Sequence, residues 1–525
     1  MSNLSSTPAE ILDRICSYIS SPKDLLYVAL AARKFNQVII PDHIQFRNIR
    51  CDFRRKNVWQ KLAAAPAKAA RFVEVEIVDE RGTDGYHDPR GLPIIFPRSL
   101  DTSSDTEGTE GYTSAVATLA SALRLMSNLR AFHWYTAAVR PTNEVFLALR
   151  EASSPVESIE VLNYDDGLET SIRTVELERS PLWKFTDLTK FSFTEHHNDA
   201  ELQAYITYTN EMADMLIHRC PNLEDLQLYQ NHHYHSVLPE EIVQYIFLNG
   251  RWPALRRATV EGDPLDIAVI DAFFAHHPRL ERVMVLERDL PARVFSYLTN
   301  LKSLSVRWTK DLAAGDHKPF EQLTTLSLDL PDHVSGEVCK GLGRILRSIP
   351  SLCHLTLHHA TYTQELLLSV QEHAPNLTRL ALRWDPHEMY IDSVNDWDSN
   401  CGYWQKFVSR FSQLTHLAFV DPCLWEEADE SSEGNSDDGD DDASEATSDA
   451  TDRCLRALTA ASPHLVYVGI ATDDDTEREW VAIERTAGGV YAGYHKVLNA
   501  YRVREVSWGD WYLGAMDGHL DKKEW

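Results

Sequence analysis

Histidine and cysteine are the residue types of this chain that could do chemistry, but their spacing argues against it. The densest histidine cluster holds His232, His233 and His235 in a segment that predicts a loop. A zinc site needs cysteine, histidine or carboxylate ligands at spacings that let them converge, and no such set flanks this cluster. The 8 cysteines form no Cys-x-x-Cys pair, and none is placed with a histidine as nucleophile and base. We therefore expect no metal, no cofactor and no catalytic residue.

Arginine recurs at positions that predict a shared binding surface. Several short segments alternate between apolar and polar residues, which is typical of strands with one buried face. The candidate ligand-binding residues on the opposite face are Tyr229, Arg257, Arg282, Arg307, His354, His358, Arg379 and Arg383. Because arginine binds carboxylates and phosphates bidentately, we expect an acidic or phosphorylated protein segment as the ligand. The alternative is that these arginines pair with neighbouring carboxylates on the sheet.

These strands belong to a repeat in which apolar residues occupy the first, fourth and sixth positions. Candidate repeats begin at Phe72, Leu129, Val156, Leu188, Leu223, Leu255, Leu280, Leu301, Leu323, Leu352, Leu377, Leu414, Leu465 and Val503. The pattern and most of the intervals from Leu223 on resemble those of leucine-rich repeats. No single repeat can bury its apolar residues alone, but a stack can. We therefore predict an α/β fold, an irregular solenoid with a parallel β-sheet inside and helices outside, for which 334–349 and 364–373 are examples.

The first forty residues predict two short amphipathic helices that need a partner. Pro8 is suited to start the first helix, and Ile11, Leu12, Ile15 and Ile19 follow at helical spacing. A break at Ser20-Ser21-Pro22 precedes the second helix, for which Asp24 is the expected N-cap. So small a unit cannot bury both apolar faces by itself.

This segment resembles an F-box of the large fungal families. Thr7 stands where the family usually has leucine, but the rest of the motif is present. The residues that carry the resemblance are Pro8-Ala9-Glu10-Ile11-Leu12, Ile15, Ile19, Pro22-Lys23-Asp24-Leu25-Leu26, Ala29-Leu30 and Arg33-Lys34-Phe35. The resemblance implies a substrate-recognition subunit of a Skp–cullin–F-box ubiquitin ligase, itself non-catalytic, that docks on the Skp-type adaptor and through it on a cullin. The adaptor-binding residues that it implies are Pro8, Ile11, Leu12, Ile15, Leu25 and Phe35. The alternatives are a helical hairpin that caps the solenoid, and a repeat scaffold that acts outside any ligase.

The chain therefore divides into an F-box at 1–43, a connecting segment at 44–70 and the repeats at 71–525. Within the connecting segment we expect a strand at 44–53 and a helix at 57–65. Residues 80–113, rich in Gly, Asp, Ser, Thr and Pro, predict a loop insertion. Trp308 and Trp384 are expected to pack beneath strand-to-helix turns. Two irregular stretches, 385–410 and 471–500, carry no catalytic motif.

Charge is distributed unevenly. The formal net charge is −28, and residues 1–71 carry 12 Lys/Arg against 5 Asp/Glu, or +7, which leaves −35 for the remainder. So acidic a body argues against binding to nucleic acid or to an anionic membrane. Residues 426–452 hold 13 Asp/Glu and no Lys or Arg, which predicts a disordered insertion that either solubilises the chain or recruits a basic partner. Without a signal peptide or an apolar span, a cytoplasmic or nuclear location is expected.

Overall fold

The computed structural model describes two compact units. The described residues are 7–17, 19, 22–40, 47–78, 109–135, 141–152, 154–163, 180–195, 206–229, 240–261, 266–285, 290–314, 320–331, 334–358, 364–383, 401–420, 443–471, 478–486 and 489–500. Unit 1 holds those up to Leu255, and unit 2 those from Arg256 on. No helix within these ranges is both long and apolar enough to cross a membrane.

Unit 1 begins with three helices, one more than the sequence predicted. They are α1 (Ala9–Ser17), α2 (Pro22–Ala31) and α3 (Arg33–Ile39). Their core is formed by Cys16, Leu25, Ala29 and Ile39. The expectation that Asp24 caps the second helix was wrong, because α2 already starts at Pro22 and Asp24 lies in its first turn. Proline is favoured at the first helical position, where its missing N–H would have no partner within the helix.

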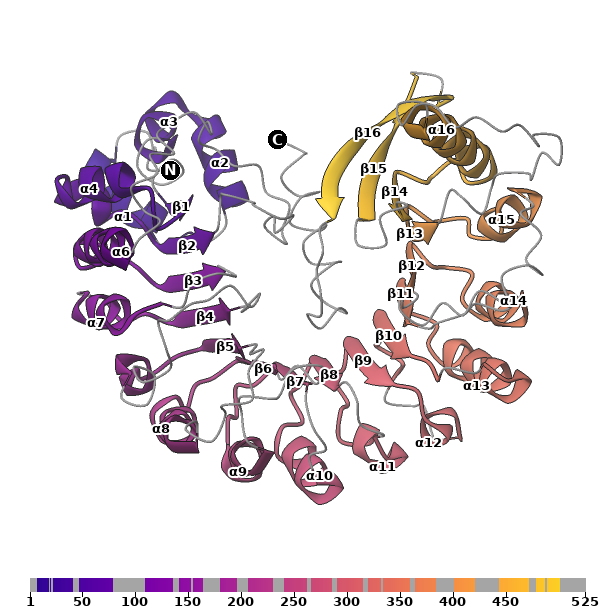
Figure 1. Ribbon diagram of the computed structural model, residues 1–525, viewed down its shortest axis with the longest axis horizontal. Coiled ribbons are helices and arrows are strands. Elements are labelled where there is room, and N and C mark those ends of the chain that lie inside the picture. Colours follow the sequence, from indigo (N-terminus) through magenta and orange to yellow (C-terminus); the bar gives the residue numbers. More distant parts are fainter. Residues whose placement is uncertain are drawn as a thin grey trace. The chain divides into compact units, whose positions relative to one another are not determined.

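The rest of unit 1 is a parallel sheet with helices on one side. Its strands, each paired with the next along the chain, are β1 (Asn48–Cys51), β2 (Glu74–Val78), β3 (Ala131–Tyr135), β4 (Ser158–Asn163), β5 (Lys190–Glu195) and β6 (Asp225–Tyr229). The helices between and after them are α4 (Lys56–Ala63), α5 (Pro66–Ala69), α6 (Thr109–Leu123), α7 (Asn143–Glu151), the 3-10 helix Pro181–Lys184, α8 (Ile206–Asp214), the π-helix Met215–Arg219 and α9 (Glu240–Asn249). In Figure 1, α4, α6 and α7 lie on the same side of β1–β4.

Unit 2 repeats the same arrangement (Figure 1). Its parallel strands are β7 (Arg257–Glu261), β8 (Arg282–Val285), β9 (Ser303–Arg307), β10 (Thr325–Asp329), β11 (His354–His358), β12 (Arg379–Arg383), β13 (His416–Val420) and β14 (Tyr467–Ala471). The helices are α10 (Ile267–His276), α11 (Ala292–Phe295), α12 (Lys310–Ala314), α13 (Gly336–Arg347), α14 (Gln364–His373), α15 (Cys401–Val408) and α16 (Ala443–Ala461).

The predicted repeat is confirmed wherever the structure describes it. A strand follows every predicted repeat start except Val503, which lies outside the described residues. In the repeat of β10, for example, Leu323, Leu326 and Leu328 are all buried. A backbone ladder joins successive repeats, because the residue just before each strand offers its carbonyl to the next repeat. The Lys302 carbonyl thus accepts hydrogen bonds from the N–H groups of Thr324 and Thr325, at 2.9 and 3.0 Å.

Threonine side chains reinforce this ladder. The hydroxyls of Thr189, Thr324, Thr378 and Thr415 each donate to the carbonyl of the equivalent residue in the preceding repeat, at 2.9–3.1 Å. Such a threonine uses its only proton within the ladder, so its oxygen can serve any other group only as an acceptor.

Three expectations about segment boundaries need correction. The repeats are interrupted after β14, because β15 (Arg478–Arg485) and β16 (Tyr491–Ala500) pair antiparallel; residues 501–525 lie outside the described part. The loop predicted at 80–113 is helical from Thr109 on, and 79–108 lie outside the described residues. The acidic insertion is helical in its last part, where α16 spans 443–461 and buries Cys454, Leu455 and Leu458. Acidic residues are favoured in the early turns of a helix by its dipole, and 421–442 lie outside the described residues.

Trp308 packs beneath the strand-to-helix turn, as predicted, against a glycine of α13. A Cβ atom placed on Gly341 would lie 2.7 Å from Cζ2 of Trp308 and 2.9 Å from Cβ of Ala313. Both neighbours are buried. The glycine therefore sets how closely α13 can approach Trp308. Trp384 lies outside the described residues.

We predict that Gly341→Ala lowers the free energy of unfolding of unit 2 by about 1–3 kcal/mol, because the buried indole ring cannot move away from the added methyl group. This loss should exceed the gain of up to about 1 kcal/mol that alanine brings to a helix interior. Urea unfolding measures the change. Gly336→Ala is the control, because its Cβ would meet only the flexible carboxylate of Glu365, at 3.2 Å. Equal effects of the two substitutions would contradict the prediction.

Candidate functional sites

The N-terminal helices expose large apolar side chains to solvent. Ile11 and Ile15 lie one turn apart on α1 and are 49% and 47% exposed. Tyr27 and Leu30 lie one turn apart on α2 and are 57% and 69% exposed. We call these four residues the apolar helix surface. Monomeric proteins expose single apolar residues freely, whereas a contiguous exposed apolar patch is typical of an interaction surface.

The sequence assigned these helices six adaptor-binding residues, and the structure divides them into two groups. Ile11, Ile15 and Pro8 are exposed and available to a partner. Leu12 and Leu25 are buried, at 2% and 0% exposure, so the expectation that they contact an adaptor is corrected: they support the helices from within. Phe35 is half-buried and packs against the helical core. Tyr27 and Leu30 were missed, although their spacing of three on the second helix could have indicated an exposed stripe.

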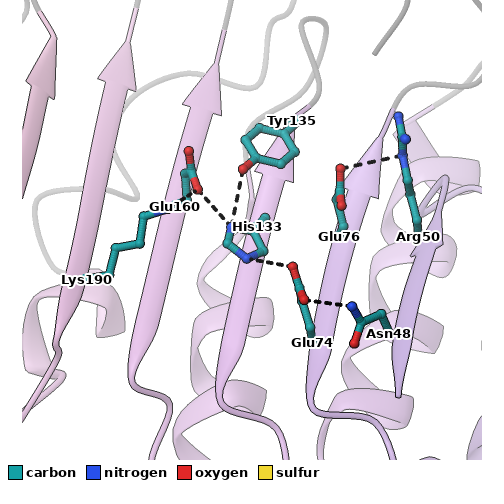
Figure 2. A network of polar contacts seen from close by, with 8 residues as sticks. All are labelled: Asn48, Arg50, Glu74, Glu76, His133, Tyr135, Glu160 and Lys190. Carbon is teal, nitrogen blue, oxygen red and sulfur yellow. Dashed lines mark hydrogen bonds and ion pairs between the residues drawn. The ribbon is translucent and has the colours of Figure 1, made fainter. Parts of the chain in front are cut away.

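A second candidate site is the face of the unit 1 sheet opposite its helices, where a row of charged residues crosses the strands. The row runs through the middle positions of β1–β4 and contains Arg50, Glu76, His133 and Glu160, each in register with the next. Figure 2 shows these side chains together with Asn48, Glu74, Tyr135 and Lys190. Nε of Arg50 lies 3.5 Å from Oε1 of Glu76. We call this set the β1–β5 polar network.

His133 is the centre of the network and is held between two carboxylates (Figure 2). Its Nδ1 lies 2.9 Å from Oε2 of Glu160, and its Nε2 lies 3.3 Å from Oε1 of Glu74. Burial of the ring lowers the pKa of His133, but the hydrogen bonds and charges of Glu160 and Glu74 outweigh burial and raise the pKa above its ordinary value of 6.5. The imidazolium form can donate to both carboxylates at once.

The carboxylates of Glu74 and Glu160 also accept hydrogen bonds from other side chains. Nζ of Lys190 donates to Oε2 of Glu160 at 3.1 Å, and Nδ2 of Asn48 donates to Oε2 of Glu74 at 2.9 Å. With His133 protonated, Lys190 and the ring balance the charges of Glu74 and Glu160. These contacts satisfy the ring of His133 and the carboxylates of Glu74 and Glu160 within the sheet. The network was not predicted from the sequence, although the weaker repeats from Phe72 to Leu188 follow the same register as the stronger ones.

The third candidate site is the corresponding face of unit 2, which carries basic residues in its first row, the residues that begin the strands. From β7 to β13 this row reads Arg257, Arg282, Ser303, Thr325, His354, Arg379 and His416, in register between neighbouring strands. Arg257 and Arg282 are exposed, and Arg379 is half-buried. No carboxylate belongs to the row, so this edge of unit 2 is suited to an anionic ligand.

The structure brings only part of the predicted ligand-binding set together. His354 and Arg379 are neighbours in the first row of unit 2, and Nδ1 of His354 lies 3.3 Å from Oγ1 of Thr325. His358, at the other end of β11, has its Nε2 3.1 Å from Oγ of Ser327. Arg307 has its Nε 3.9 Å from Oδ2 of Asp329, as the alternative of pairing on the sheet anticipated.

The other members of that set lie apart or are not described. Arg257 and Arg282 are in register with each other, on β7 and β8. Tyr229 ends β6 and belongs to unit 1, and the side chains of Tyr229 and Arg383 lie outside the described part. The histidine cluster at 231–235 also lies outside the described residues, and the described ones contain no group of three or more His, Cys, Asp or Glu that could hold a metal ion.

His416 is the buried member of the first row and was missed by the sequence reading. Its ring stacks on Tyr467, with centroids 5.0 Å apart and planes at 24°. Its Nδ1 lies 2.7 Å from Oγ1 of Thr415. Burial, together with the positive charges of Arg379 and His354, lowers the pKa of His416 to about 3. His416 is therefore neutral at physiological pH, whereas His133 is driven towards its charged form.

We predict that His133→Gln lowers the free energy of unfolding by about 2 kcal/mol near pH 6 and by less near pH 8. A histidine whose pKa is raised on folding contributes stability that is fully present below its unfolded pKa of about 6.5 and is lost as the pH rises through the raised value. Denaturant unfolding at the two pH values measures the difference.

The control for this prediction is His276→Gln, which makes the same chemical change at an exposed position on α10. Its effect should be small at both pH values. An equal loss for His133→Gln at both pH values would show that the ring acts in the network without its charge.

Comparison with known proteins gives resemblances of fold only. No protein-family model matches the chain, and no curated protein matches it. Among solved structures, the chain is similar to the leucine-rich repeat-containing protein LegL7 from Legionella pneumophila, with a TM-score of 0.33, 11% identity, and coverage of 69% of this chain and 92% of that one. It is also similar to a chain of the Toll–Spatzle complex from Drosophila, with a TM-score of 0.24, 13% identity, and coverage of 72% of this chain and 44% of that one.

Proposed function

We propose that this protein is a substrate-recruiting subunit of a Skp–cullin–F-box ubiquitin ligase. In this proposal the three N-terminal helices bind a Skp-type adaptor and through it a cullin. The strand faces opposite the helix layer hold a protein substrate. The chain performs no chemistry: it raises the local concentration of substrate lysines near a conjugating enzyme bound elsewhere in the complex.

The observation that carries the proposal is the apolar helix surface. Ile11, Ile15, Tyr27 and Leu30 remain exposed although the helices beneath them already have a core of their own. Covering a branched apolar side chain contributes roughly 1.5–3 kcal/mol, so a partner on this surface would gain several kcal/mol. The division into buried Leu12 and Leu25 and exposed Ile11 and Ile15 suits a small helical unit that docks on a second protein.

A second candidate function is a repeat scaffold that binds proteins outside any ligase. The β1–β5 polar network and the basic first row of unit 2 are as compatible with this function as with the ligase role, because a protein binds the strand faces in both. The two functions differ only in what the apolar helix surface contacts.

The test is co-purification of the full chain with a Skp-type adaptor and a cullin, using Ile15→Asp and Leu30→Asp. Each substitution places a charge in the proposed interface without touching the core, and each is expected to weaken adaptor binding at least about tenfold. Leu12→Asp would be a poor test, because Leu12 is buried and its loss would disrupt the helices themselves.

Leu248→Asp supplies the control, since it makes the same change on α9 at a leucine that is 46% exposed. It should retain the adaptor and the cullin. If the intact chain binds no adaptor, the ligase role fails and the scaffold remains. If the chain binds adaptor without cullin, the scaffold is again favoured.

A further inference from the structure

One nitrogen in the first row of unit 2 is buried without a hydrogen bond. Nε2 of His416 has no hydrogen-bond partner within the described part of the chain. His416 is only 6% exposed. Buried polar atoms are nearly always hydrogen-bonded, so an exception on a candidate binding face points to a group that is supplied from outside.

The ladder of the repeats bears on the protonation of this ring. The hydroxyl of Thr415 lies 2.9 Å from the carbonyl of Thr378 and 2.7 Å from Nδ1 of His416. We assign its only proton to the carbonyl, as in the other threonines of the ladder; its oxygen then accepts from Nδ1, and the proton of the neutral ring lies on Nδ1. Nε2 consequently carries a lone pair that can take up a proton.

Among the described residues of the first row, those beside His416 are cationic or neutral. The strands paired with β13 are β12, which contributes Arg379 to the row, and β14, which contributes Tyr467. One strand further, β11 contributes His354, in register with Arg379. No carboxylate occupies the row at these strands. Arg379 and His354 oppose a proton on His416, and the same two groups would attract an anion.

We propose that His354, Arg379 and His416 form a subsite for one anionic group, a carboxylate or a phosphate, of a protein segment bound to unit 2, and that Nε2 of His416 takes up a proton from solvent as this group binds. This inference rests on the part of the proposed function that places a protein ligand on the strand face, and is independent of the adaptor. Arg379 supplies the bidentate donor. The anion cancels the repulsion between Arg379 and a charged His416, and the protonated Nε2 then donates to the anion.

Proton uptake makes binding depend on pH in a defined direction. Between the pKa of His416 in the free protein and that in the complex, apparent affinity rises up to tenfold for each unit by which the pH falls. Lowering the pH from about 7.5 to about 6 should therefore strengthen binding by up to about thirtyfold, provided that the ligand keeps its charge. Sulfate and acetate keep their charge over this pH range. Sulfate serves as the probe for a phosphate group, and acetate as the probe for a carboxylate.

The experiment is NMR of the full chain labelled at histidine Cε1, titrated with sulfate or acetate against chloride at equal ionic strength. The expected result is a saturable shift of the His416 signal to the imidazolium position, stronger near pH 6 than near pH 7.5. A stronger response to sulfate indicates that the anionic group of the bound segment is a phosphorylated residue. A stronger response to acetate indicates that it is an Asp or Glu side chain. No saturable shift with either probe, or a shift of equal strength at both pH values, would overturn the proposal.

Variants locate the response and separate it from the ligase role. Arg379→Gln should weaken probe binding at least about tenfold. His416→Gln should abolish the pH dependence of probe binding, and the NMR signal that it removes is that of His416. His276→Gln, on the outer helix α10, should change neither. Unaltered binding in Arg379→Gln would refute the subsite. Adaptor co-purification with each variant should be unchanged, so a failure of the subsite is distinguishable from a failure of the ligase role.

Discussion

The structure depends on one constraint: the three apolar residues of each repeat can be buried only by their neighbours. A five-residue strand has no core of its own, so Leu323, Leu326 and Leu328 are buried only because adjacent strands and outer helices cover them. The backbone ladder fixes the register, since the carbonyl before a strand, such as that of Lys302, accepts from two N–H groups of the next repeat. A shift by one residue would turn every apolar side chain to the opposite face.

The same constraint leaves the polar strand positions free to vary. Because the helices cover only one side, residues between the apolar ones need not be apolar, and the two units use them differently. Unit 1 places Arg50, Glu76, His133 and Glu160 at its middle positions, whereas the middle positions of β9–β12 in unit 2 hold Ser305, Ser327, Thr356 and Ala381. Unit 2 concentrates charge in its first row instead. One scaffold thus presents surfaces of distinct chemistry.

The repeats could be predicted because their signal is local and recurs. The spacing around Leu323 is visible without knowing what lies beside it, and α14 was predicted with its observed bounds, 364–373. The raised pKa of His133 could not be predicted, because its two carboxylates come from strands more than twenty residues away on either side. The strands β15 and β16 lack the repeat's spacing of apolar residues at the first, fourth and sixth positions. The helix at 443–461 was not predicted because its first turns are acidic.

The contrast between His133 and His416 separates a structural network from a binding site. Both rings are buried on a strand face, yet carboxylates on both sides raise the pKa of the first, and burial and cationic neighbours lower the pKa of the second. Both nitrogens of the His133 ring lie beside a carboxylate, so this ring needs no ligand to be stable. Among the described residues of the first row, the charged neighbours of His416 are cationic, and Nε2 of His416 has no described hydrogen-bond partner. An anion at that position would satisfy both, which is why the first row of unit 2 is a stronger candidate for ligand binding than His133 and its two carboxylates.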